Sequence, residues 1–81
     1  MLVVVHFYSY FKELTGSAQT TATLSEGATI NDLLDTLSTR FPKLAAMRKS
    51  TLVAVSVDYQ NRHYVLKEGD EVSLFPPVQG G

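Results

Sequence analysis

The sequence contains no cysteine. Without thiols, no disulfide or thiolate metal site can supplement the core, so hydrophobic packing alone must hold the fold. A chain of 81 residues has no room for two cores and is expected to form one domain. The apolar fraction of 44% fits an ordinary globular domain, and the charged fraction of 19% is too low for a disordered chain.

No charge of one sign dominates either. Seven basic and eight acidic residues give a net charge of −1, and so balanced a chain has no field to attract nucleic acid. No apolar run approaches the ~20 residues that a membrane span needs. The N-terminus lacks the basic, apolar and cleavage regions of a signal peptide. We therefore expect a cytoplasmic protein that binds neither nucleic acid nor membrane.

One local concentration of charge stands out within this balance. Four of the seven basic residues fall within ten positions, and we interpret them as a solvated face, with a docking patch as the alternative. They are Arg40, Lys43, Arg48 and Lys49.

Alternating apolar residues predict several strands. Residues 1–8 are β-branched and aromatic, and alternation separates Val3, Val5 and Phe7 from Leu2, Val4, His6 and Tyr8. Further strands are expected at 19–24, 52–58, 63–66 and 71–75. In residues 52–58, alternation separates Val53, Val55 and Val57 from Leu52, Ala54 and Ser56.

The clearest element is a helix that begins after Thr29. This residue can act as the N-cap, and Asp32 places an acid in the first turn, beside the positive end of the helix dipole. Pro42 must end the helix at or before Phe41. Between these limits, apolar residues recur at helical spacing and form a single stripe: Ile30, Leu33, Leu34, Leu37 and Phe41.

The predicted order is therefore β-β-α-β-β-β in an α+β fold. One amphipathic helix cannot bury its stripe alone, but a mixed sheet of four to five strands wrapped on it can provide the cover. This arrangement is the β-grasp, or ubiquitin-like, fold, in which the first and last strands lie side by side at the sheet centre. We assign residues 1–75 to this domain and residues 76–81 to an extended C-terminal tail.

Few side chains offer catalytic chemistry. His6 and His63 are the only histidines, and no pair of carboxylates at helical spacing accompanies either. A zinc site needs about four ligands, at least three of them from the protein, so no metal site is predicted. Ser-His-Asp catalysis needs a cleft, which a chain of this size offers little room for. We expect the domain not to be a catalyst by itself.

The end of the sequence has a different character. Pro76 and Pro77 lock φ near −65° and favour an extended tail, which continues through Val78 and Gln79. Six extended residues reach roughly 20 Å. The final pair, Gly80 and Gly81, has no Cβ and can therefore enter a channel too narrow for any side chain. A frayed terminus is the alternative, but a β-grasp pattern followed by Pro-Pro and Gly-Gly favours a tail that reaches into another protein.

Over its whole length the sequence resembles the small subunit of molybdopterin synthase, a family of sulfur-carrier proteins. The resemblance is carried by residues 7–16 (FYSYFKELTG), by the helix after Thr29 and above all by residues 66–81 (LKEGDEVSLFPPVQGG). The last stretch is close to the family pattern L-x-x-G-D-E-V-x-x-x-P-P-V-x-G-G. Two departures are Lys12, where the family often has Arg, and residues 56–58, which replace an Asn-containing turn.

The resemblance implies a function for the tail. An adenylating enzyme similar to the ubiquitin activators would use ATP to form an acyl-adenylate on Gly81, and a sulfur donor would convert it to a thiocarboxylate. The large subunit of molybdopterin synthase would receive the tail and supply the catalytic side chains that transfer sulfur to a pterin precursor during molybdenum cofactor biosynthesis. A heterotetramer with that subunit is expected, and the carrier itself would bind no cofactor tightly.

The outer sheet face is the expected docking surface. Alternation places His6 and Tyr8 beside Phe75, next to the root of the tail, and aromatic residues are enriched at interface cores. The alternative is that loops of this chain cover these residues.

Three other functions stay open. A thiamine-pathway sulfur carrier shares the fold and the Gly-Gly end, although its chains are usually shorter and less often have Pro-Pro. A ubiquitin-like modifier would instead join Gly81 to target lysines. A plain interaction module would have an incidental tail.

Overall fold

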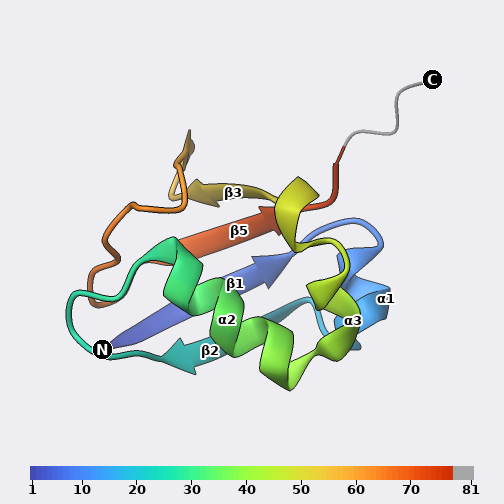
Figure 1. The fold of residues 1–81 in the computed structure, drawn as a ribbon, viewed down its shortest axis with the longest axis horizontal. Helices are drawn as coiled ribbons and strands as arrows, with labels where there is room; N and C mark the ends of the chain where they lie inside the picture. Colours follow the sequence, from blue (N-terminus) through green and yellow to red (C-terminus); the bar gives the residue numbers. More distant parts are fainter. Residues whose placement is uncertain (78–81) are drawn as a thin grey trace.

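Five strands form one mixed sheet in the order β2-β1-β5-β3-β4. The computed structural model describes residues 1–77. Figure 1 shows the helices gathered on one face of this sheet. The strands are β1 (Leu2–Phe7), β2 (Gln19–Thr23), β3 (Leu52–Val55), β4 (Asp58–Tyr59) and β5 (Glu71–Phe75).

The first and last strands lie side by side, as the β-grasp prediction required. Strands β1 and β5 are parallel, with Val5 opposite Val72 and Phe7 opposite Leu74. Both have a second neighbour, because β1 pairs antiparallel with β2 and β5 pairs antiparallel with β3. The strand that leads into the tail therefore lies between two other strands.

The principal helix, α2 (Ile30–Arg40), begins and ends where the sequence predicts. Thr29 and Asp32 form a reciprocal capping box, in which the Thr29 Oγ1 accepts from the Asp32 N–H at 3.3 Å and the Asp32 carboxylate accepts from the Thr29 N–H at 2.9 Å. Pro42 starts a separate short helix, α3 (Pro42–Ala45). The other helical segments are α1 (Phe11–Thr15) and the 3₁₀ turn η1 (Arg48–Ser50).

The core lies between α2 and the inner face of the sheet. The stripe of α2 is buried except for Phe41, which is half-buried and meets Phe7 edge-to-face at 5.6 Å between ring centroids. The sheet contributes the inward residues of β1, β3 and β5. The prediction that alternate residues of these strands share one face is therefore confirmed for this set. These buried residues are Val3, Val5, Phe7, Val53, Val55, Val72 and Leu74.

Two of the four clustered basic residues make bonds within the chain. Arg40 donates to the Thr21 carbonyl and to the Thr20 hydroxyl, both at 2.8 Å, and so ties the end of α2 to β2. Arg48 pairs with Asp35 and donates to Asn31 at 3.0 Å. These cations stabilise the helix layer, which argues against a free docking patch at residues 40–49.

Two strand predictions in the second half are wrong. Residues 52–58 do not form one strand: β3 ends at Val55, and Val57, expected on the same face as Val53 and Val55, is 91% exposed while those two are buried. The cause is Ser56, whose left-handed φ of 57° reverses the chain and starts β4 at Asp58. Tyr59, predicted in a turn, is part of this edge strand.

The expected strand at 63–66 is reduced to a single bridge between Val65 and Thr29. Residues of this loop instead supply carbonyl groups to the start of α2. The Ile30 N–H donates to Tyr64 and the Asn31 N–H donates to Arg62, at 3.0 and 3.1 Å. The first-turn amides of a helix have no partner within it, so this loop satisfies the helix and has no strand of its own.

Replacing Ser56 with glycine is expected to stabilise the fold by about 0.5–1 kcal/mol, because glycine adopts positive φ without a Cβ penalty. Val57 is a matched control in the same turn, since its φ is not positive, and Val57→Gly should instead be neutral or destabilising. Urea denaturation of the two variants checks this. A loss of stability in Ser56→Gly would contradict it.

Candidate functional site

The predicted tail begins at the end of a central strand. Strand β5 ends at Phe75, and the half-buried Pro76 and Pro77 follow directly (Figure 1). The other predicted tail residues, Val78, Gln79, Gly80 and Gly81, lie outside the described residues. The chain therefore leaves the sheet from its middle, at the end where β1 turns into α1.

The structure brings the predicted docking residues together on the outer face. Tyr8 and Phe75 stack at 4.7 Å between ring centroids with an interplanar angle of 11°. The ring centroids of His6 and Tyr8 lie 6.5 Å apart, and the His6 Nε2 is 2.9 Å from Oε1 of Glu71. Tyr8 is 41% exposed, so no loop within residues 1–77 covers its ring.

Two further residues complete this surface, and the sequence prediction missed both. Tyr59 meets Phe75 edge-to-face at 6.2 Å and is 68% exposed. Leu52 is the register partner of Phe75 and is 40% exposed. Alternation set Leu52 apart from Val53 and Val55, which was the available signal for it, but Tyr59 had no such signal because it was assigned to a turn. The name aromatic cluster is used below for Tyr8, Tyr59 and Phe75 together with the adjacent Leu52.

A shallow groove runs beside the root of the tail. Its walls include Tyr10, Leu52 and Tyr59, and Phe75 and the two prolines lie along it. The lining is mostly apolar. Because the groove and the aromatic cluster share Leu52, Tyr59 and Phe75, one partner surface can cover both.

Arg62 supports this surface from the side of β3. Its Nη2 donates to the carbonyl groups of Thr51 and Arg48, at 2.8 and 2.9 Å, and so fixes the backbone just before Leu52. Burial, and then the neighbouring Arg48 guanidinium, lower the pKa of Arg62 from its usual value. This arginine acts as a structural donor that holds the start of β3.

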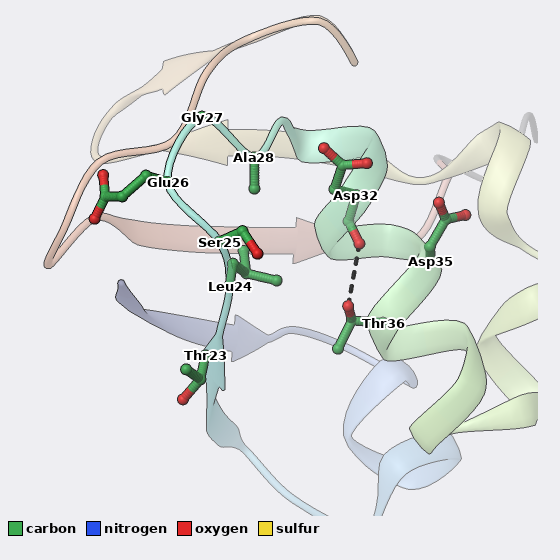
Figure 2. A pocket seen from close by; sticks show the side chains of 9 residues that line it. All are labelled: Thr23, Leu24, Ser25, Glu26, Gly27, Ala28, Asp32, Asp35 and Thr36. Atoms are coloured by element: carbon green, nitrogen blue, oxygen red, sulfur yellow. Dashed lines mark hydrogen bonds between the residues drawn. The ribbon is translucent and has the colours of Figure 1, made fainter.

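A second hollow lies at the opposite end of the molecule, around the loop between β2 and α2 (Figure 2). Three carboxylates line it, from Glu26, Asp32 and Asp35. Asp32 is used in the capping box and Asp35 in the pair with Arg48. Residues 1–77 contain no group of three or more acidic or histidine side chains placed to hold a metal ion.

The histidines do not form a catalytic arrangement in the described part of the chain. His6 lies on the sheet with Glu71, while His63 is exposed in the loop after β4. None of the helices formed by residues 1–77 is long and apolar enough to cross a membrane. What distinguishes the site is therefore a chain end that leaves a central strand beside an exposed aromatic cluster.

Fold and site define a ubiquitin-like β-grasp protein with a tail at the end of its last central strand. The model of the ThiS family matches residues 5–81, and the chain belongs to this family. A relative from Chlamydomonas reinhardtii, named molybdopterin synthase sulfur carrier subunit, is 32% identical over 84 residues and is covered over 100% of both chains. The human protein of that name is 30% identical, with 98% of this chain and 93% of its own covered.

Solved structures agree with this assignment. SAMP1 from Haloferax volcanii is similar with a TM-score of 0.89, 25% identity and 100% of both chains covered. A structure described as a putative molybdopterin converting factor, subunit 1, from Pyrococcus furiosus has a TM-score of 0.88 and 29% identity, covering 96% of this chain and 99% of its own. A complex of subunits 1 and 2 of the molybdopterin-converting factor from Helicobacter pylori, with a TM-score of 0.69 and 23% identity over 100% of both chains, shares the fold.

Proposed function

We propose that this chain is the sulfur carrier subunit of a molybdopterin synthase. The observation that carries the proposal is the family match over residues 5–81, together with relatives of that name at 30–32% identity over nearly the whole chain. The final residues, Phe-Pro-Pro-Val-Gln-Gly-Gly, lie within the matched region. The function is therefore assigned to the chain as a whole.

The reactive group in this proposal is the carboxylate of Gly81. An α-carboxylate is ionised at neutral pH and resists nucleophilic attack. An activating enzyme, similar to ubiquitin activators, joins the carboxylate oxygen to the α-phosphate of ATP and releases pyrophosphate. Sulfide-level sulfur from a donor then attacks the carbonyl carbon, the bond to AMP breaks, and the terminus becomes a thiocarboxylate. The carrier needs no cysteine, because the sulfur is held by the main chain.

The partner in this proposal is the large subunit of molybdopterin synthase, in a heterotetramer. The aromatic cluster supports a docking role, because exposed aromatic residues are typical of interface cores and these surround the start of the tail. The structure from Helicobacter pylori is described as a complex of two subunits of the molybdopterin-converting factor. The cytoplasmic location expected from the sequence stays a prediction.

A second candidate function has support of its own. SAMP1 from Methanosarcina acetivorans, whose structure shares this fold, is described as a small archaeal modifier protein, and SAMP1 from Haloferax volcanii matches at 25% identity. A modifier would use the same activated glycine, but its acceptor would be a lysine amine. A thiamine-pathway carrier would form the same thiocarboxylate and differ only in the enzyme that receives the sulfur.

The mass of the C-terminal peptide separates a sulfur carrier from a modifier, and a transfer assay separates the two kinds of carrier. We expect chain co-expressed with its activating enzyme to show the mass increase of one sulfur in place of one oxygen at Gly81. The charged carrier should then yield molybdopterin with the large subunit and no thiazole product with thiamine-pathway enzymes. Lysine conjugates without a thiocarboxylate would favour the modifier, and an unmodified terminus would contradict both.

A further inference from the structure

Hydrogen bonds near the two ends of β5 show which neighbouring strand each following residue would face. The Tyr8 N–H donates to the Leu74 carbonyl at 3.2 Å, so residue 74 faces β1. On the other side, the Ser56 N–H donates to the Glu71 carbonyl at 2.9 Å, so residue 71 faces β3. Backbone polar groups alternate sides along a strand. In a continued strand, residue 76 would therefore face β1 and residue 77 would face β3.

Both of these positions are prolines, which have no N–H to donate. If the parallel ladder with β1 continued, the N–H at position 76 would donate to the Tyr8 carbonyl. If the antiparallel ladder with β3 continued, the N–H at position 77 would donate to the Ser50 carbonyl, following the register in which Leu52 pairs with Phe75. Each proline thus removes one bond to a different neighbour, and a single proline would free the chain from only one of them.

The neighbouring segments also change direction at this level. Ser9 has a left-handed φ of 55° and turns the chain from β1 towards α1, where the Tyr8 carbonyl accepts from the Phe11 N–H at 3.2 Å. On the other side, Ser50 belongs to η1, and its N–H donates to the Met47 carbonyl at 3.1 Å. The bond made by Ser50 uses its N–H and not its carbonyl, and a carbonyl oxygen such as that of Tyr8 has two lone pairs. An N–H at position 76 or 77 could therefore still pair with these two carbonyl groups, and the prolines prevent this.

We propose that Pro76 and Pro77 act as a two-sided stop that ends the sheet at Phe75 and so sets the length of chain available to carry Gly81 to another enzyme. The stop follows from the described residues, whereas its effect on reach rests on the proposed carrier function. An extended residue spans roughly 3.3 Å. Pairing of positions 76 and 77 with the sheet would shorten a reach of roughly 20 Å to roughly 13 Å.

Valine substitutions restore the missing N–H donors, and amide hydrogen exchange measures directly whether the new N–H groups are hydrogen-bonded. In Pro76→Val and in Pro77→Val, we expect the new amide to exchange about fivefold more slowly than in a free peptide of residues 74–81, the factor that corresponds to one net hydrogen bond. In the double variant, the rate of thiocarboxylate formation by the activating enzyme should fall about tenfold, because the shortened tail reaches the active site less often. The control is a synthetic chain with N-methylvaline at both positions, which keeps the side chain and lacks the N–H. It should keep the wild-type rate.

The two measurements test the two parts of the proposal separately. Free exchange of the new amides in all three variants would overturn the two-sided stop. Slowed exchange with an unchanged rate of thiocarboxylate formation would overturn its effect on reach. If the unaltered chain forms no thiocarboxylate at all, the proposed function fails, and the exchange measurement still decides whether the prolines stop the sheet.

Discussion

Adding one alanine after Gly81 is expected to abolish thiocarboxylate formation and leave the melting temperature unchanged. In the proposed function, the activating enzyme acts on the carboxylate of a residue without a Cβ, and an added alanine moves the carboxylate and adds a methyl group. The packing of residues 1–77 does not involve the added residue. The loss should therefore be complete in mass spectra of protein co-expressed with the activating enzyme.

Deleting Gly81 should have the same effect for the opposite reason, because the carboxylate then lies one residue short. The control is an alanine added before Met1, which lies at the end of the sheet opposite to the end of β5 (Figure 1), and this addition should leave activation unaffected. Sulfur transfer by the extended chain without prior trimming would contradict the proposed role of Gly81. Equal loss from the N-terminal addition would point to a general effect of lengthening.

Replacing Phe75 with alanine is expected to weaken binding of the large subunit at least thirtyfold, which corresponds to about 2 kcal/mol. Phe75 stacks on Tyr8 and meets Tyr59 edge-to-face, so it is the central ring of the aromatic cluster. Truncation removes this ring and loosens both neighbours. The cost to folding should be smaller, about 1 kcal/mol, since Phe75 is only half-buried.

Leu74 is the matched control for this experiment, because it is the preceding residue and points to the opposite face. It is 1% exposed, and Leu74→Ala should cost about 2–5 kcal/mol of folding stability while the remaining folded protein keeps its affinity. Calorimetric titration and urea denaturation of both variants give the two quantities. If Phe75→Ala lost as much stability as affinity, Phe75 would be a core residue and the docking surface would lie elsewhere.

The sequence by itself determined the elements whose signals are local. Thr29 and Asp32 fix the start of α2, and Pro42 fixes its end, because capping and the missing proline N–H act within a few residues. Alternation sorted the side chains of β1 and β5 into inner and outer faces correctly, since the period of two is a property of the strand. The aromatic pair of Tyr8 and Phe75 followed from that sorting, once both strands were placed at the sheet centre.

Tertiary structure decided the second half of the sheet. The left-handed Ser56 ends β3 early and makes Tyr59 part of an edge strand, and neither feature has a distinct pattern in the sequence. Within residues 60–70, pairing is limited to the Val65 bridge, and the carbonyl groups of Arg62 and Tyr64 accept instead from the first turn of α2, about thirty positions away in the chain. Pairings over such distances depend on which partners the folded chain brings together. The sequence therefore indicated the tail and part of the proposed docking surface, while only the structure showed that the two prolines follow a strand with a neighbour on each side.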